Sequence, residues 1–423
     1  MTVNKPTLVS LFSGAGGLDA GLEIAGFSTV FSTDTDRDCI ETLQRAKAAK
    51  MLIPSRPDKS FLEYASLVHA DVADIDPRDI RPAGAATDWQ PDLLAGGPPC
   101  QPFSSAGKML SVDDRRGRLF EEFVRLADGL KPKLILFENV RGMVTARGPQ
   151  GRPGEILSLV RDAFERIGYA TTFALLNAAN FGVPQRRVRC FMMASRRQPL
   201  PRFPVPTHAE QPGLTLFDSL QPWVTLGEFL ATQPPASPND IVRTTTELGV
   251  QLALLAEGTG LKSAGARETT RPGGHWGYRQ GTFIADPKKP ARTVTAGPTQ
   301  DWLRLSDGSF RRLTWQECAG LQGFPQEWPF AGSTISKYRQ VGNAVPVQLG
   351  VELGNVLRDA LRSEAPMHPP VSDPFPTAFV DAMAYTRREE LRNGESRRSV
   401  REYLAVGDVS MSIASKGRGR EVG

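Results

Sequence analysis

The residues around Cys100 are the first in this sequence that could support chemistry. Cys100 follows Gly97, Pro98 and Pro99 and precedes Gln101. Prolines stiffen the backbone and remove amide donors, so this composition is typical of a shaped loop rather than of a packed core. An isolated cysteine is most often a buried structural residue, and that alternative stays open at this point. In a loop, a cysteine with a deprotonated thiol would be a nucleophile.

Basic residues could supply the positive surroundings that a reactive thiol needs, because a nearby cation stabilises the thiolate. Lys108, Arg115 and Arg116 follow the cysteine closely, and Arg187 and Arg189 could converge on it from elsewhere in the chain. The sequence therefore makes Cys100 a candidate nucleophile.

A glycine-rich turn near the N-terminus is a second candidate site. The apolar run at 7–12 leads into the glycines of residues 13–17, and a helical pattern begins at Leu18. Glycines let a ligand approach the main chain, so such a turn is typical of nucleotide-type ligands. In the dinucleotide fingerprint the third glycine would fall at position 19, which is Asp19, and this disfavours a dinucleotide. A tight turn with a purely structural role remains an alternative.

Asp34 ends the next expected strand. A carboxylate at this place could accept the two ribose hydroxyls of a nucleotide-type ligand. On its own, an aspartate at a strand end is more often a helix cap than a ligand, and a helix is expected from Asp36 onward.

The elements that would position these residues alternate between strands and helices. Apolar strands separated by helices indicate a mostly parallel sheet with helices on both faces, in which ligands bind beyond the carboxyl ends of the strands. The expected strands are 7–12, 27–33, 67–70, 93–95 and 134–137, and the clearest helices are 118–130 and 155–167.

The character of the chain changes near residue 196. From there to residue 289 proline, glycine and threonine are frequent, which indicates a loop-rich domain. We expect four parts: 1–196, 197–289, 290–362, and a basic, partly disordered extension at 363–423. Thr314 and Glu317 form an expected capping box, and Gly342-Asn343 is expected to precede a last apolar helix.

Composition limits the class of protein. The 423 residues carry a net charge of +5, a modest excess that favours polyanionic partners without establishing one. The four cysteines have no CxxC spacing, so we expect neither a disulfide framework nor a metal site. We see no signal peptide and no apolar run long enough to cross a bilayer, and we expect a cytoplasmic protein.

Five motifs in this order together resemble the cytosine-C5 DNA methyltransferase family of bacterial type. The resemblance covers roughly residues 7–196 and 290–360, and it implies a Rossmann-like S-adenosylmethionine methyltransferase fold with a smaller, loop-rich target-recognition domain. The motifs are residues 12–17, Pro98-Pro99-Cys100, Glu138-Asn139-Val140, Gln185-Arg186-Arg187-Val188-Arg189 and Gly342-Asn343-Ala344-Val345-Pro346.

The resemblance implies a role for each catalytic residue. Cys100 would add to carbon 6 of a cytosine and so activate carbon 5. Glu138 would donate to N3 of the ring, which requires a raised pKa. Arg187 and Arg189 would hold the base carbonyl and position the cysteine loop. No residue is named for removal of the proton from carbon 5, which water commonly takes in this family.

S-adenosylmethionine is the implied methyl donor, with no metal. Thr35 departs from the large apolar residue that relatives often carry there. Asn343 could instead be a helix cap, and the helix after it would return beside the first strand. The implied cofactor residues are Phe12, Gly14, Gly16, Gly17, Asp34, Thr35, Asp71, Val72, Leu119, Asn343 and Val345.

Double-stranded DNA is the implied substrate, from which the target cytosine must be flipped out. A mobile loop at 104–116 would close over the base, with Ser104, Lys108 and Arg116 as expected DNA contacts. The segment 197–289 would read base edges in the major groove. The basic tail after Arg387 could add affinity for phosphate, and a solvated helix without a role is the alternative.

The sequence disfavours three rival functions. The tRNA-methylating branch of the family typically carries a Cys-Phe-Thr tripeptide in its recognition region, and 197–289 contains no cysteine. A non-enzymatic relative would lose the Pro-Cys or Glu-Asn-Val elements, which are intact, and a dinucleotide oxidoreductase is disfavoured by Asp19. We expect a monomer that associates with the bacterial nucleoid through DNA, with a cognate restriction endonuclease as a candidate partner that acts separately.

Overall fold

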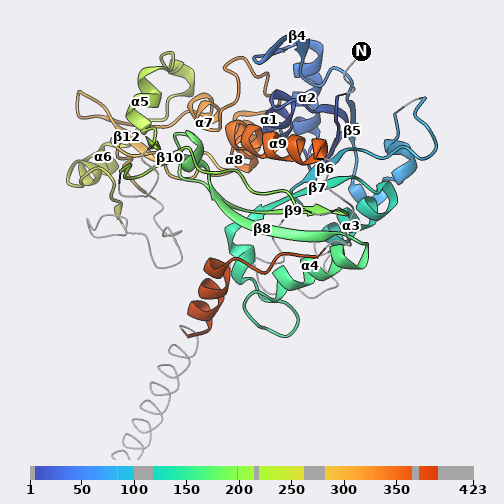
Figure 1. The fold of residues 1–423 in the computed structure, drawn as a ribbon. Helices are drawn as coiled ribbons and strands as arrows, with labels where there is room; N and C mark the ends of the chain where they lie inside the picture. Colours follow the sequence, from blue (N-terminus) through green and yellow to red (C-terminus); the bar gives the residue numbers. More distant parts are fainter. Residues whose placement is uncertain are drawn as a thin grey trace, which may run out of the picture.

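The computed structural model describes residues 5–82, 84–99, 118–197, 199–213, 219–261, 282–363 and 371–388 (Figure 1). Its centre is a seven-stranded sheet in the order β5-β2-β1-β6-β7-β9-β8. The strands are β1 (Thr7–Leu11), β2 (Ser28–Asp34), β5 (Ser66–His69), β6 (Leu93–Gly96), β7 (Leu134–Val140), β8 (Ala170–Asn177) and β9 (Val188–Ser195).

The sheet is mostly parallel, and β9 is the strand that breaks the pattern. The neighbours from β5 to β7 pair in parallel, whereas β9 runs antiparallel to both β7 and β8. The predicted fold class, a mostly parallel sheet with covering helices, is confirmed. β8 and β9 were not anticipated among the strands read from the sequence.

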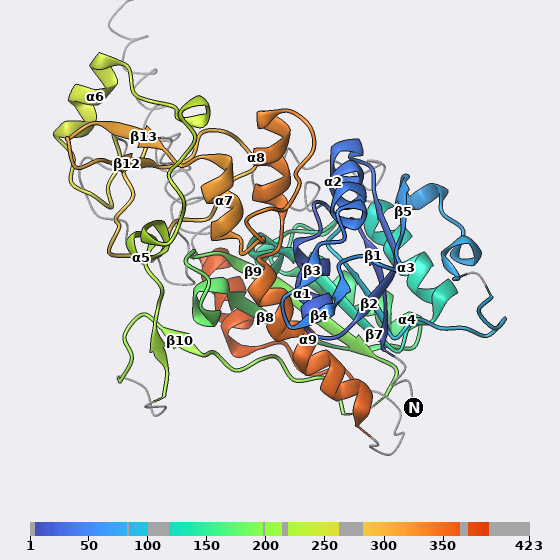
Figure 2. The same ribbon diagram turned by 90° about the horizontal axis from the view of Figure 1, so that it is seen from above.

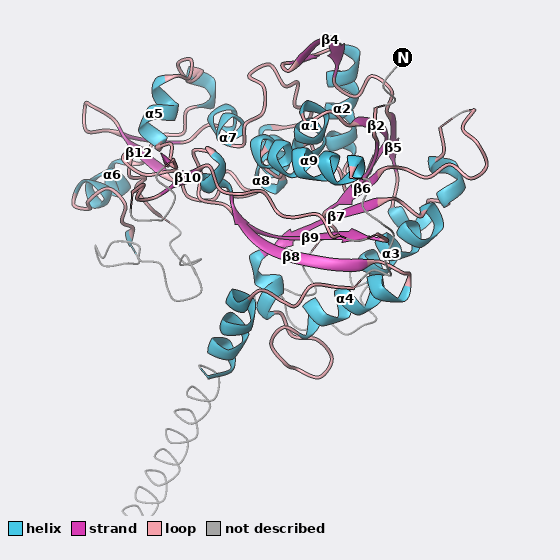
Figure 3. Ribbon diagram, in the orientation of Figure 1, coloured by secondary structure: helices cyan, strands magenta, loops and turns pink. Residues whose placement is uncertain are grey.

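Helices cover both faces of the sheet because successive strand residues point to opposite sides. Leu8 packs with α1 (Gly17–Ile24) and α9 (Val347–Arg362), while Val9 packs with α3 (Arg118–Leu130) and α4 (Glu155–Arg166). Figure 3 shows α1 and α9 side by side on one face and α3 and α4 on the other. A third cluster joins α2 (Arg37–Ala48) to α7 (Trp315–Leu321) and α8 (Thr334–Asn343).

The last helix begins later than expected. Gly342 and Asn343 end α8, and α9 starts at Val347 with Pro346 as its N-cap. Val345 therefore lies in the connection and not in the helix, because a proline is well accommodated at the very start of a helix but not inside it. The expected capping box of Thr314 and Glu317 is confirmed at the start of α7.

A smaller body lies beside the sheet (Figure 2). Leu252, Ile284, Trp302 and Phe310 form its own small cluster. Leu252 and Ile284 precede the expected boundary at residue 289, whereas Trp302 and Phe310 follow it. The domain limits therefore stay predictions. Its elements are β10 (His208–Ala209), β11 (Gln221–Pro222), α5 (Leu226–Ala231), α6 (Thr246–Ala253), β12 (Trp302–Arg304) and β13 (Phe310–Arg312).

Part of the 363–423 segment packs on the free edge of the sheet. The amide of Asp373 donates to the carbonyl of Thr171 in β8 at 3.0 Å. Phe379, in the short helix that follows, is 1% exposed and belongs to the core cluster under α3 and α4. Residues 371–388 therefore cover an edge strand that would otherwise offer unpaired backbone groups.

Candidate active site

The glycine turn follows β1 and is built from unusual backbone angles. Phe12, Gly14 and Gly16 have φ values of 55°, 56° and 84°. Glycine adopts this region without strain, whereas Phe12 must be held in it by its surroundings. Phe12 is partly buried and packs on the core cluster that contains Val9. The turn thus presents a partly buried aromatic side chain at Phe12 and partly buried main chain at Gly14 at the end of β1.

Asp34 holds this turn from the neighbouring strand. Its Oδ2 accepts the amide of Gly14 and its Oδ1 accepts the amide of Asp36, both at 2.8 Å. Burial raises the pKa of Asp34. Each carboxylate oxygen can accept more than one hydrogen bond, so each retains capacity for a ligand hydroxyl.

The main chain is open on the Cβ side of Gly14 and closed by a neighbouring backbone on the Cβ side of Gly17. A Cβ on Gly14 would meet no atom within 4 Å, whereas one on Gly17 would lie 2.4 Å from the carbonyl oxygen of Val345. The residues expected to bind S-adenosylmethionine are therefore compatible with it, with open main chain at Gly14 and a carboxylate at Asp34.

The remaining expected cofactor residues lie near the ends of the same strands. Asp71 follows β5 and accepts the amide of Ala73 at 3.0 Å, so it caps the short helix that begins with the buried Val72. Thr35 is exposed. Leu119 is partly buried against the core, and Asn343 is exposed at the end of α8. Asn343 does not cap α9, because Pro346 occupies that position.

Glu138 lies where β7 ends beside β6. A Cβ on Gly97 would lie 2.5 Å from Oε2 of Glu138. The absence of a side chain at Gly97 therefore leaves the space that the carboxyl occupies. Arg189 brings its Nε to 3.1 Å from Oε1 of Glu138, and both side chains are about one-seventh exposed, at 15% and 14%. Burial raises the pKa of Glu138, while the charges of Arg189 and Arg187 oppose the shift.

Asn139 fixes the start of the cysteine loop, a role that its place next to Glu138 signals only weakly in the sequence. Its Nδ2 donates to the carbonyl of Pro98 at 3.2 Å, and the residue is 4% exposed. Pro98 is buried and Pro99 is exposed, so the chain leaves the core between them. Cys100, Ser104, Lys108 and Arg116 lie outside the described residues.

Arg187 is 1% exposed, and its charge acts on Glu138 as that of Arg189 does. Its guanidinium donates to the carbonyls of Val294 at 3.1 Å and of Gly342 at 2.7 Å. The structure therefore brings Glu138 and Arg189 together as a pair and places Arg187 between two distant segments. Two fully buried glutamines lie near it: Gln185, which belongs to a motif but has no role assigned from the sequence, and Gln322, which the sequence does not single out.

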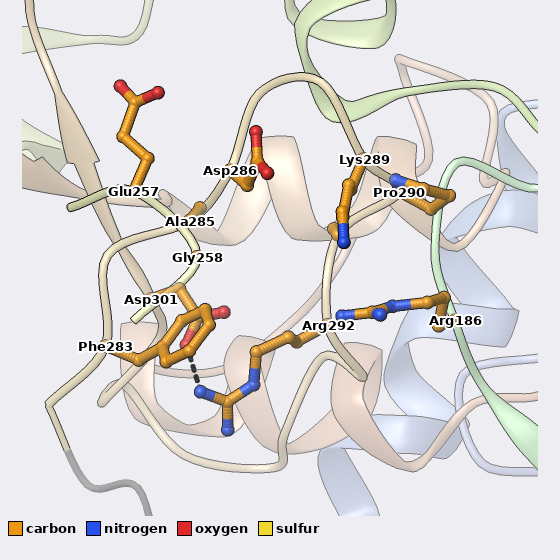
Figure 4. Close-up of a pocket in the computed structure, with 11 residues that line it drawn as sticks. Arg186, Glu257, Gly258, Phe283, Ala285, Asp286, Lys289, Pro290, Arg292 and Asp301 are labelled. Atoms are coloured by element: carbon orange, nitrogen blue, oxygen red, sulfur yellow. Dashed lines mark ion pairs between the residues drawn. The ribbon is translucent and has the colours of Figure 1, made fainter. Parts of the chain in front are cut away.

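A hollow lies where the small body meets the catalytic part (Figure 4). Arg292 pairs with Asp301 at 3.6 Å and lies over the ring of Phe283. Arg186, Lys289 and Arg292 are balanced there by Glu257, Asp286 and Asp301, so the lining carries no net charge. None of the expected methyl-donor residues lines this hollow, and we assign it no part in the chemistry.

Neither a metal-binding cluster nor a membrane-spanning helix is found within the described parts of the chain. No cluster of three or more His, Cys, Asp or Glu residues that could hold a metal is found among them. No helix in these parts is long and apolar enough to cross a membrane.

The sheet order and the glycine turn after β1 define a Rossmann-like methyltransferase fold. Solved structures support this fold: the S. pombe Dnmt2 methyltransferase aligns with a TM-score of 0.58 at 17% identity, covering 85% of this chain and 99% of that one. The EhMeth methyltransferase of Entamoeba histolytica aligns with a TM-score of 0.52 at 15% identity, covering 85% and 100%.

The family model for C-5 cytosine-specific DNA methylase matches residues 7–358, and the chain belongs to this family. It is 32% identical over 358 residues to the Type II methyltransferase M.NgoFVII of Neisseria gonorrhoeae, covering 83% of this chain and 86% of that protein. It is 36% identical over 238 residues to the Type II methyltransferase M.AquIA of a Picosynechococcus species, covering 55% and 90%.

Proposed function

We propose that this C-5 cytosine methylase transfers the methyl group of S-adenosylmethionine to a flipped-out cytosine in a specific duplex DNA sequence, through a covalent bond from Cys100 to carbon 6. The observation that supports this most strongly is the carboxyl of Glu138. It lies against Gly97, three residues before Cys100, and faces Arg189. An acid beside the cysteine loop is what attack on a cytosine ring requires.

The chemistry follows from these groups. The Cys100 thiolate adds to carbon 6, and the electron pair of the double bond moves toward N3, where Glu138 donates its proton. Carbon 5 then takes the methyl group. Water takes the proton from carbon 5, the thiolate leaves carbon 6, and N3 returns its proton to the carboxylate of Glu138, so the ring and the acid are both restored. Burial favours the protonated form of Glu138 that this sequence needs.

The resemblance assigns two roles to Arg187 and Arg189 together: holding the base carbonyl and positioning the cysteine loop. We propose that each arginine has a different role. Arg189 is partly exposed beside Glu138, so it is the arginine that can hold the base carbonyl. Arg187 is buried among backbone carbonyls, and its role is to position the segments that it bonds.

The methyl donor is a sulfonium, which supplies an electrophilic methyl group when bound. Phe12 and Gly14 present a ring and open main chain to it, and Asp34 offers carboxylate oxygens to its ribose. Val345 lies against Gly17 and closes the turn from the other side. Asp71, Val72, Thr35, Leu119 and Asn343 complete the proposed set, together with Gly16.

DNA would lie across the ends of the strands, with the region after residue 196 reading the sequence and Ser104, Lys108 and Arg116 meeting phosphate. Relatives are named Type II methyltransferases. We therefore propose a bacterial modification enzyme that acts as a monomer on the chromosome, in the cytoplasm, with a restriction endonuclease as a separately acting counterpart.

The test is methyl transfer from labelled S-adenosylmethionine to mixed-sequence duplex DNA, with Cys100→Ser as the control. Wild type should transfer and the variant should not; transfer by both, or by neither, contradicts the mechanism. Bisulfite sequencing of DNA from an expressing host then locates the site. A duplex with 5-fluorocytosine at that site should trap the protein covalently at Cys100, because fluorine cannot leave as a proton does.

A further inference from the structure

Two buried glutamines join segments that are far apart in the sequence. Gln185 precedes β9, Gln322 ends α7, and neither is exposed to solvent. Nε2 of Gln185 donates to Oε1 of Gln322 at 3.1 Å and to the carbonyl of Leu321 at 3.3 Å. Because a buried amide without partners is costly, these bonds give the pair one defined arrangement.

The amide nitrogen of Gln322 bonds the turn between α8 and α9. Its Nε2 donates to the carbonyls of Val341 at 2.7 Å and of Ala344 at 3.2 Å. Both partners are acceptors, so the amide nitrogen must face them and the oxygen must face Gln185. The last carbonyls of a helix lack partners within the helix, and Gln322 supplies one where α8 ends.

This turn bears directly on the glycine turn of the methyl-donor site. The carbonyl of Val345 would lie 2.4 Å from a Cβ on Gly17, so the two backbones touch without space between them. A shift of the turn toward α1 would therefore displace Gly17, and a shift away would open the closed side of the turn.

The amide oxygen of Gln185 bonds the segment around Val294, which follows the region at 197–289. Its Oε1 accepts the amide of Val294 at 2.9 Å. Arg187 bonds the carbonyl of the same Val294 and the carbonyl of Gly342, whose Cα lies against the backbone of Thr295. Direct contacts therefore run from Val294 through the glutamines and the turn to Gly17.

We propose that Gln185 and Gln322 are positioning residues that couple target DNA binding to methyl-donor binding. Gln322 keeps Val345 against Gly17, and Gln185 ties Gln322 to Val294, at the exit of the region proposed to read the target. Such coupling is reciprocal: whatever DNA does to donor affinity, the donor does to DNA affinity. This inference rests on the proposed function.

The first experiment measures binding of S-adenosylhomocysteine to the full chain by calorimetry. Gln322→Met removes the bonds to the turn while keeping the volume, and should weaken binding about tenfold, raising KM for the methyl donor while kcat changes less than about threefold. Gln340→Met is the matched control. Gln340, in the same helix as Val341, is 1% exposed, and its side chain bonds Ala331, Thr42 and Ser336, none of which lies on the path. It should destabilise comparably and leave this affinity unchanged.

The second experiment repeats the titration with a duplex that carries the site located by bisulfite sequencing. In wild type the duplex should tighten or weaken S-adenosylhomocysteine binding by about fivefold or more. In Gln185→Met the turn keeps its Gln322 bonds, so affinity without DNA should stay near wild type while the effect of the duplex falls toward onefold.

The outcomes separate this inference from the proposed function. A wild type that methylates DNA, together with Gln185→Met and Gln322→Met variants that match it in affinity, KM and coupling, overturns the inference alone. A loss of affinity in Gln340→Met equal to that in Gln322→Met also overturns it, since destabilisation would then explain both. A wild type that transfers no methyl group overturns the proposed function.

Discussion

Arg189 and Glu138 form an ion pair across the antiparallel strands β9 and β7, with 3.1 Å between Nε and Oε1. Two opposing effects act on the pKa of the Glu138 carboxyl: burial raises it, and the charge of Arg189 lowers it. A buried carboxyl and the arginine whose charge lowers its pKa are thus supplied by neighbouring strands.

Removal of the carboxyl should abolish most activity without unfolding the protein. Glu138→Ala is expected to lower kcat by about 100- to 10,000-fold, the usual contribution of a positioned acid. Glu165→Ala, on the exposed side of α4, is the control and should retain full activity. Single-turnover methylation assays make the comparison, and an active Glu138→Ala would remove the acid from the mechanism.

The pH profile should respond to the charge at residue 189. Glu138 must be protonated to donate, so activity falls as pH rises through its pKa. Arg189→Met removes a charge that lowers this pKa, so the alkaline limb of kcat against pH should move to higher pH, whatever the loss of rate. Arg189→Lys keeps the charge and should leave the limb near its wild-type place. A shift to lower pH in the Met variant would contradict this balance.

Contact between the glycine turn and the α8–α9 connection leaves no room for a side chain. Gly17→Ala would force its Cβ to 2.4 Å from the carbonyl of Val345, and overpacking of this kind costs about 1–3 kcal/mol. Gly142→Ala is the control, because its Cβ would meet nothing nearer than 3.9 Å. Denaturant unfolding measures both, and equal stabilities would show that the connection yields freely.

Asp19 should make stability depend on pH. It is 1% exposed, accepts hydrogen bonds from Ser10 and Ser32, and burial raises its pKa to about 6. Below pH 4 the carboxyl is protonated in both folded and unfolded states. Between pH 4 and 6 the unfolded chain loses this proton first, so stability falls as pH rises, by about 3 kcal/mol in total.

Asp19→Asn removes this titration. The free energy of unfolding of wild type minus that of the variant should fall between pH 4 and 6 and stay level above about pH 7. The buried Glu23, whose pKa burial raises to about 7, is present in both proteins, and the charge of Asp19 is the smallest cause of its shift, so its contribution largely cancels in the difference. A difference that does not change with pH would mean that Asp19 is not buried in solution.

The C-terminal segment should contribute to stability through one side chain. Phe379→Ala is expected to cost about 3–5 kcal/mol, since the ring is buried in the core cluster beneath α4. Its neighbour Val380 is 53% exposed, and Val380→Ala should change stability little. Thermal unfolding compares them, and equal effects would show that this segment is not docked.

The sequence predicted the parts of this molecule that are determined locally. The strand-turn-helix of residues 7–24, α3 and the capping box at Thr314 all depend on neighbouring residues, and they were found from periodicity and glycine placement. The start of α4 at Glu155 matched as well. The order of β8 and β9 at the sheet edge was not found, because strand pairing is set by tertiary packing.

The buried polar residues were the hardest to predict. Arg187 contacts carbonyls 107 and 155 residues away, and Gln185 contacts Gln322 137 residues away. No local pattern distinguishes such side chains from exposed ones. The family resemblance supplied candidate residues for the site, but only the structure separates Arg187, bonded to backbone, from Arg189, beside Glu138.

The packing of α9 on α1 has a consequence for the order in which the protein is made. Gly21 lies so close to α9 that a Cβ would be 2.4 Å from the carbonyl of Val347, and α9 is encoded more than 300 residues after the turn that it supports. A nascent chain leaving the ribosome therefore holds the turn after β1 without the backbone that closes it until residue 345 has emerged. The first turn of the fold is completed only when the strands of the sheet and the smaller body have been made.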